Sequence, residues 1–97
     1  MLVKHGKSVY RIVFRHRPGE GGVTTLDDRL VVFTGSTVCF IKNANTDIML
    51  GCGLSYVNKS DQYCKDTGRK LTLTRALRDM KANKTLRKKV WDKYLAR

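Results

Sequence analysis

The sequence has little proline, no long apolar run and no paired cysteines. Its three cysteines are odd in number and form no Cys-x-x-Cys pair, so a disulfide framework is not expected. No segment approaches the ~20 apolar residues of a membrane-spanning helix. The first fourteen residues, with a lysine at position 4, lack the apolar stretch of a signal peptide. We therefore expect a soluble protein that works inside a cell, with no membrane contact.

Acidic residues are also scarce. Eight Asp and Glu stand against 20 Lys and Arg, which gives 97 residues a net charge of +12. Residues 1–57 carry 7 basic and 4 acidic groups, whereas residues 58–97 carry 13 basic and 4 acidic groups. Such a one-sided field attracts polyanions, although a charged run can also be only a solvated face. The length predicts a single domain over 1–97.

Groups that would support catalysis are missing. The carboxylates form no recognisable pair, no Ser-His-Asp order is present, and "GEGG" at 19–22 lacks the Lys-Ser/Thr of a phosphate-binding loop. Zinc is a poor match because the spacings of the candidate ligands fit no compact site. Those ligands would be Cys39, Cys52, Cys64, His5 and His16. We expect no enzyme, no metal and no cofactor, with the cysteines as small buried residues.

The first half predicts strands. Runs rich in β-branched and aromatic residues, partly alternating with polar ones, occur at 8–16, 29–34, 37–42 and 48–57. Turns between them are expected at 17–22 ("RPGEGG"), at Gly35 and Ser36 as a hairpin, and at 43–47. In the last strand Gly51 and Gly53 indicate a bulge or a close backbone approach. Consecutive strands with short connections predict an antiparallel meander with one face to cover.

The second half predicts the helices that provide this cover. Asn58, Ser60 and Asp61 form a helix start, and an apolar stripe follows at Leu73, Ala76, Leu77 and Met80. Gly68 either ends a short helix or lets one continuous helix approach the sheet. We favour a break or kink there, because the stripe aligns only when the helix restarts after it.

A last helix is expected after Asn83, which can cap it. The side chains predicted on its apolar stripe are Leu86, Val90, Trp91, Tyr94 and Leu95. The expected fold is therefore α+β. A four-stranded antiparallel β-meander at about 8–57 is followed by a basic helical part at about 60–97, with two or three helices packed on one face of the sheet.

One motif resembles a known pattern. Residues 61–77, "DQYCKDTGRKLTLTRAL", are similar to the pattern D-x-[FY]-x-K-x-x-G-R-x5-R-A-L of a family of short proteins from tailed bacteriophages. The matching positions are Asp61, Tyr63, Lys65, Gly68, Arg69, Arg75, Ala76 and Leu77. Cys64 and Thr74 depart from the family's usual residues, and the chain adds a basic helix beyond Met80. The resemblance implies a phage origin and a compact α+β unit, and it brings no catalytic residues.

Seven residues of the helical part are candidates for contacting nucleic acid. Guanidinium groups suit phosphate oxygens, and aromatic rings among basic residues suit the bases of a single strand. The candidates are Arg69, Lys70, Arg75, Arg78, Arg87, Lys88 and Trp91. Arg87, one turn before Trp91, can stack on its ring. A purely structural explanation stays open, since the arginines can pair with Asp61, Asp66 or Asp79 and the tryptophan can anchor the core.

These observations predict a non-enzymatic phage accessory protein in the host cytoplasm. It would bind nucleic acid or a ribonucleoprotein through its basic C-terminal helices and modulate host nucleic-acid or defence machinery. The alternative is an inhibitor, anti-CRISPR-like or aimed at another defence system, that docks directly on a host protein with an acidic surface. A dimer formed through an exposed sheet edge is compatible with both.

Overall fold

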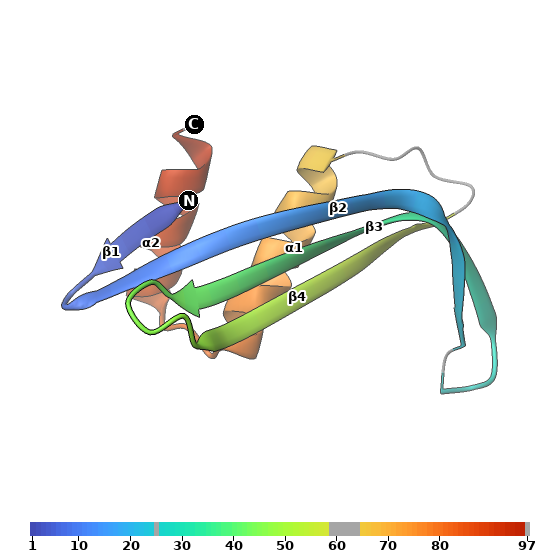
Figure 1. Ribbon diagram of the computed structural model, residues 1–97, viewed down its shortest axis with the longest axis horizontal. Coiled ribbons are helices and arrows are strands. Elements are labelled where there is room, and N and C mark those ends of the chain that lie inside the picture. The colour runs from blue at the N-terminus through green and yellow to red at the C-terminus, as the bar shows by residue number, and fades with distance from the viewer. Residues whose placement is uncertain (25, 59–64, 97) are drawn as a thin grey trace.

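The computed structural model describes residues 1–24, 26–58 and 65–96, which form a sheet and two helices (Figure 1). The strands are β1 (Leu2–His5), β2 (Ser8–Thr24), β3 (Leu30–Asn43) and β4 (Met49–Asn58), and the helices are α1 (Lys65–Asp79) and α2 (Lys84–Leu95). All neighbouring strands pair antiparallel in the order β1-β2-β3-β4. The predicted α+β meander followed by helices is confirmed.

The turn predicted at 17–22 is wrong, because β2 continues through it. Arg17 pairs with Ser36, and the pairing resumes at Gly21 opposite Phe33 after a register shift between Pro18 and Gly21. Such a β-bulge accommodates a proline, which cannot donate to the ladder, and Gly19 there adopts a φ of 136°. The strand therefore bends at this sequence instead of ending, and Figure 1 shows the far end of the β2–β3 hairpin turned away from the rest of the sheet.

The hairpin predicted at Gly35 and Ser36 is also wrong. Gly35 pairs with Pro18 on one side and with Val57 on the other, so 30–34 and 37–42 belong to one strand, β3. The two flanking ladders hold this strand together across the glycine. The turn between β2 and β3 falls instead after Thr24, where Asp28 has a positive φ of 61°. The turn predicted at 43–47 is confirmed, with the Asn43 side chain accepting from the amides of Asn45 and Thr46.

The first strand, β1, was not predicted. It pairs with the start of β2, with His5 opposite Ser8 and Leu2 opposite Arg11. A two-residue turn at Gly6 and Lys7 joins the strands, and Gly6 has the positive φ of 61° that such a tight hairpin requires. The Met1 amino group donates to the Ile12 carbonyl oxygen at 3.0 Å, which fixes the chain terminus against β2.

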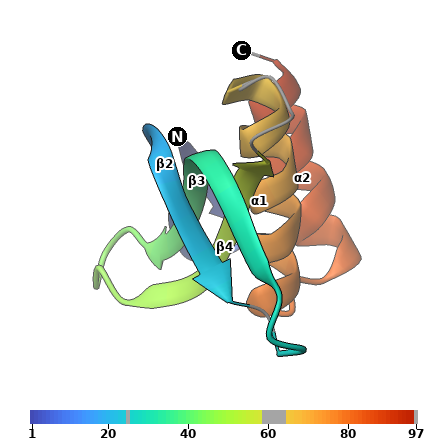
Figure 2. The same ribbon diagram turned by 90° about the vertical axis from the view of Figure 1, so that its right-hand side faces the viewer.

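Both helices lie on one face of the sheet, as Figure 2 shows end-on. Helix α1 packs over β3 and β4, and α2 lies over β1. The core between them is formed by alternate strand residues such as Ile12, Cys39 and Ile41 and by the helical stripe. Leu73, Ala76 and Leu77 are at most 1% exposed and Met80 packs against them, so the stripe predicted for α1 is confirmed.

Helix α1 is continuous through Gly68, so the break favoured there is wrong. A Cβ at this position would lie 2.5 Å from Thr37 Oγ1, so the glycine allows α1 to approach β3 closely. The close approach predicted at Gly51 and Gly53 is confirmed, because a Cβ at Gly53 would lie 2.0 Å from the Thr72 carbonyl oxygen. Asn58 ends β4, and the other two predicted helix-start residues, Ser60 and Asp61, lie outside the described residues.

Helix α2 begins at the predicted cap. The Asn83 side chain accepts a hydrogen bond from the Leu86 amide at 2.8 Å. Leu86, Val90 and Tyr94 are buried as expected, but Leu95 is 65% exposed, so its assignment to the apolar stripe is wrong. Leu95 follows Leu86 by nine residues, which places it about 180° around the helix from that buried side chain.

Candidate functional site

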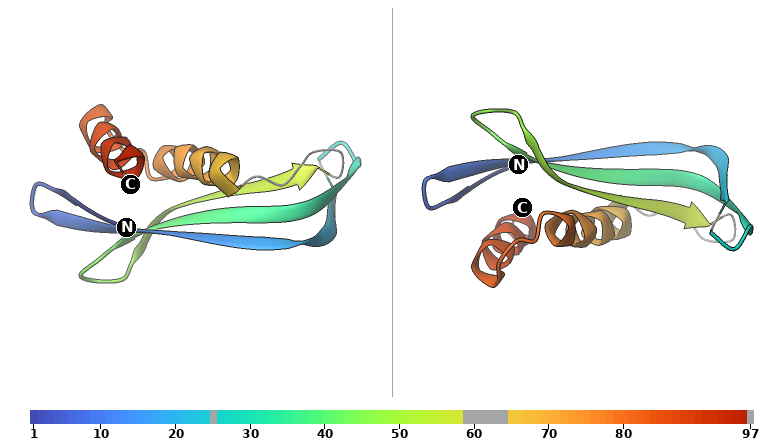
Figure 3. Two further views of the ribbon diagram at one scale, coloured as in Figure 1. Left: turned by 90° about the horizontal axis from the view of Figure 1, so that it is seen from above. Right: turned by 90° about the horizontal axis from the view of Figure 1, so that it is seen from below.

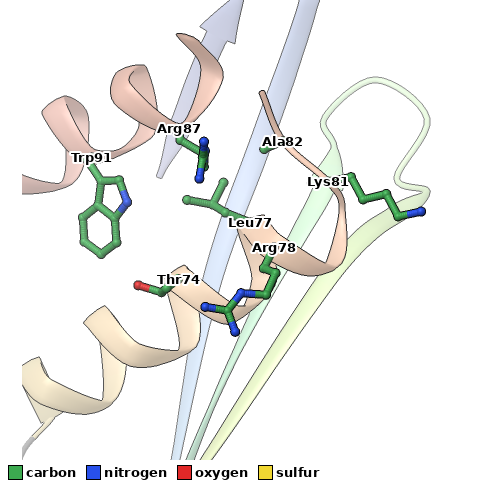
Figure 4. A pocket seen from close by; sticks show the side chains of 7 residues that line it. All are labelled: Thr74, Leu77, Arg78, Lys81, Ala82, Arg87 and Trp91. Atoms are coloured by element: carbon green, nitrogen blue, oxygen red, sulfur yellow. The ribbon is translucent and has the colours of Figure 1, made fainter. Parts of the chain in front are cut away.

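A groove between α1 and α2 brings three of the seven candidates for nucleic-acid contact together (Figure 4). Arg78 comes from α1, whereas Arg87 and Trp91 lie one turn apart on α2. We call this the interhelical groove; it has a volume of about 410 Å³ and is lined by Thr74, Leu77, Arg78, Lys81, Ala82, Arg87 and Trp91. Leu77, which is 1% exposed, belongs to the core, so the groove is anchored on the packed part of the fold.

The chain reversal between the helices adds a cation that was not predicted. The Ala82 amide donates to the Leu77 carbonyl oxygen and the Lys81 amide to the Arg78 carbonyl oxygen, a pattern that ends α1 in a Schellman motif. Lys81 has a positive φ of 55° at the position where glycine is preferred. Sequence reasoning missed it, because no glycine marks the end of the helix.

The interhelical groove is positively charged. Arg78, Lys81 and Arg87 are exposed, and none of the described residues that line the groove is acidic. Within the described ranges, none of the three forms an ion pair with a carboxylate. Their charges therefore remain available to an anionic ligand.

Trp91 is half-buried at one end of this groove. Its ring packs edge-on against the ring of Tyr94, with centroids 5.8 Å apart and an interplanar angle of 86°. Trp91 thus combines the predicted core role with a partly accessible side, and both it and Arg87 project into the space between the helices in Figure 4. The stacking of Arg87 on Trp91 stays a prediction.

Arg69 and Lys70 lie elsewhere, beside Asp66 and Tyr94. Lys70 Nζ is 3.1 Å from Asp66 Oδ2, and the Tyr94 hydroxyl donates to Asp66 Oδ1 at 3.0 Å. The hydrogen bond from Lys70, followed by that from Tyr94, holds the pKa of the Asp66 carboxyl below its ordinary value of 3.8. Lys70 is therefore partly neutralised by a carboxylate of its own helix.

Arg75 and Lys88 also have local partners. Lys88 Nζ lies 3.0 Å from Asp92 Oδ2, one turn along α2. Arg75 Nη1 donates to the Leu54 carbonyl oxygen, and Asp79 on the same side of α1 accepts from the Cys52 amide at 3.0 Å. Both backbone groups belong to β4, the last strand of the sheet, so α1 covers part of the edge that a second copy would need for pairing.

Of the two cysteines that the structure describes, Cys39 is buried as predicted, whereas Cys52 is half-buried. Cys39 is fully buried, and burial first, with Cys52 nearby as the second cause, raises the pKa of its thiol to about 12. A thiol of that pKa stays protonated and is a weak nucleophile. Among the described residues, no group of three or more His, Cys, Asp or Glu side chains could hold a metal ion. Cys64 lies outside the described residues.

Comparison with protein-family models, with curated proteins and with solved structures finds no match to this chain. In the described part of the chain, neither helix has the length and apolar character to cross a membrane.

Proposed function

We propose that this is a non-enzymatic phage accessory protein that binds nucleic acid, alone or within a ribonucleoprotein, in the host cytoplasm. The observation that carries the proposal is the interhelical groove, in which Arg78, Lys81 and Arg87 converge beside Trp91 with no acidic residue in the lining. The family resemblance of residues 61–77 supports the phage origin.

The groove suits phosphate chemistry. Guanidinium groups present several donors in a planar fork that matches phosphate oxygens, and a lysine adds a mobile point charge. These contacts read no base sequence, so the expected binding is non-specific and falls steeply with salt. Lys81 supports the assignment through its charge, because it is exposed and lines the same groove as the two arginines.

A charge-matched pair of double variants tests the proposal. Arg78→Gln/Arg87→Gln removes two charges from the groove, whereas Lys70→Gln/Lys88→Gln removes two charges that are already paired with Asp66 and Asp92. The affinity of each variant for a labelled duplex is measured by fluorescence anisotropy at several salt concentrations. For the groove variant, the slope of log affinity against log salt should become smaller in magnitude by about 1.8, which is about 0.9 for each lost phosphate contact. The control should change it little. Equal slopes for the two variants would refute the groove as the binding site.

A pull-down from nuclease-treated host lysate separates this function from direct docking on a host defence protein. Under the proposal, captured partners disappear after nuclease treatment. A protein partner that survives the treatment would instead favour the inhibitor alternative, in which the positive groove meets an acidic protein surface.

A further inference from the structure

In the described part of the chain, no helix or strand covers the face of the sheet opposite the helices (Figure 3). Helices α1 and α2 cover Ile12, Cys39 and Ile41, so the alternate residues of the same strands point to the open side. On β2 these are Arg11, Val13, Arg15 and Arg17, and on β3 they include Val38, Phe40 and Lys42. We call this side the open sheet face.

The pairing of the strands places the apolar side chains of this face next to one another. Arg15 lies opposite Val38, which in turn lies opposite Leu54 of β4, and Val13 lies opposite Phe40. The arginines thus form a stripe along β2, and the apolar side chains occupy the middle of the sheet beside it. Leu54 is 42% exposed, and Phe40 is half-buried.

Two shallow grooves run over this face and join. One, of about 450 Å³, is lined by Arg11, Val13, Arg15, Phe40, Lys42, Asp47 and Met49. The other, of about 430 Å³, is lined by Arg15, Arg17, Ser36, Val38, Phe40 and Leu54. Arg15 and Phe40 line both grooves, so the two adjoin and form one path along β2 and β3.

The charge on this path is one-sided. Arg11, Arg15 and Arg17 are exposed, and none of them forms an ion pair with any carboxylate of the described residues. Asp47 is the one acidic residue in the lining of the two grooves, and it lies 3.9 Å from Lys42 Nζ. A second copy of the chain stacked on this face would therefore bring arginines against a surface of like charge.

We propose that the open sheet face is a second binding site, specific for single-stranded nucleic acid. Phosphates would follow the arginine stripe on β2, and bases would lie over Phe40 and the apolar row of Val38 and Leu54. Neighbouring arginines such as Arg15 and Arg17 are about 7 Å apart along the strand. The inference rests on the proposed function, to which it adds the form of the nucleic acid.

The mixture of side chains favours a single strand over a duplex. A duplex presents phosphates to a flat surface and would leave the apolar middle of the sheet unfilled, whereas an unpaired strand offers base faces that stack on aromatic rings. An acidic peptide would satisfy the arginines but would not use the face of the Phe40 ring.

The test compares two double variants that remove equal charge. Arg11→Gln/Arg15→Gln changes the open sheet face, and Arg78→Gln/Arg87→Gln changes the interhelical groove. Each is titrated against labelled oligo(dT) of about 16 nucleotides and against a duplex of the same length. For Arg11→Gln/Arg15→Gln, the salt slope of oligo(dT) binding should be smaller in magnitude than that of the wild type by about 1.4. Its binding to the duplex should equal that of the wild type.

A third variant tests stacking without changing charge. Phe40→Leu should weaken oligo(dT) binding about tenfold and leave the salt slope unchanged. Circular dichroism and thermal unfolding confirm that each variant keeps its fold; Arg11 and Arg15 are exposed, so their replacement should not affect it.

The outcomes separate the two sites. If only the groove variant loses affinity for oligo(dT), the open sheet face is refuted and the groove stands. If the sheet variant and Phe40→Leu lose it and the groove variant binds both oligo(dT) and the duplex as wild type does, the groove is refuted and the open sheet face stands. Absence of any binding at low salt refutes both, and polyglutamate that displaces oligo(dT) equally well, charge for charge, would overturn the nucleic-acid assignment in favour of an acidic peptide.

Discussion

The two faces of the sheet use the same strands in opposite ways. On the covered face, Gly51, Gly53 and Thr37 keep side chains small, and α1 approaches until its backbone nearly touches the strands. On the open face, arginines and larger apolar side chains stand over solvent. The stability of the protein should therefore depend on the covered face and on the helices above it. Ligand binding should depend on the open sheet face and the interhelical groove. The following predictions test this division, from the largest expected effect to the smallest.

The largest effect is expected at Gly53. Gly53→Ala would place a methyl group 2.0 Å from the Thr72 carbonyl oxygen and 2.7 Å from the Ala76 amide nitrogen, both of them backbone atoms of a packed helix. We expect the free energy of unfolding to fall by about 4 kcal/mol or more.

The matched control is the next residue, Leu54, which points to the open face and is 42% exposed. Leu54→Ala should cost about 1 kcal/mol or less in urea unfolding. Similar losses for the two variants would contradict the distinction between the faces.

The second prediction compares two leucines of α1. Leu73 is 0% exposed and Leu71 is 41% exposed. Leu73→Ala removes buried methyl groups and leaves a cavity, so it should destabilise the protein by about 2–5 kcal/mol, whereas Leu71→Ala should cost less than about 1 kcal/mol. Equilibrium unfolding of both variants measures the difference, and a reversed order would mean that α1 packs through another face.

These pairs also indicate what could be read from the sequence. The helical stripe, the Asn83 cap and the close approach at Gly51 and Gly53 follow from local spacing, and all three were predicted. Gly35 and Pro18 led to the two wrong turn predictions. Each lies inside a strand because it pairs with a strand that is distant in the sequence, and such pairing leaves no local signal. The alternation of Arg11, Val13, Arg15 and Arg17 was visible, but the strand it belongs to was expected to end at His16.

The candidate site was predictable only in part for a related reason. Helical spacing placed Arg87 one turn before Trp91, and both side chains line the interhelical groove. Which cations share one groove depends instead on how α1 and α2 meet, and this is set by the chain reversal at Lys81. The i,i+4 pairing of Lys70 with Asp66 and of Lys88 with Asp92 could have been foreseen from spacing alone.

The third prediction separates stability from binding at one residue. Lys81→Gly relieves a positive φ of 55° and should raise the free energy of unfolding by about 1 kcal/mol. It also removes one charge from the interhelical groove and should reduce the salt slope of duplex binding by about 0.9. Thermal unfolding and anisotropy on the same sample provide both values. A variant that is more stable and binds with an unchanged slope would remove Lys81 from the site.

The smallest effect concerns pH. Because the pKa of Asp66 is lowered in the folded protein, its contribution to stability is present above the ordinary value of 3.8 and is lost as pH falls below it. Asp66→Asn should flatten the decline in unfolding temperature between about pH 5 and pH 2 slightly, because the side chain is exposed and its ion pair is weak. Identical pH profiles for the variant and the wild type would show that the hydrogen bonds of Asp66 with Lys70 and Tyr94 contribute nothing measurable.

The most direct test of nucleic-acid binding is the affinity of the wild-type protein for oligo(dT) between about 50 mM and 200 mM salt. Three exposed arginines on the open sheet face predict about three phosphate contacts with oligo(dT) and a log-log slope of about −2. A slope near zero, or no binding at the lower salt concentration, would contradict the account.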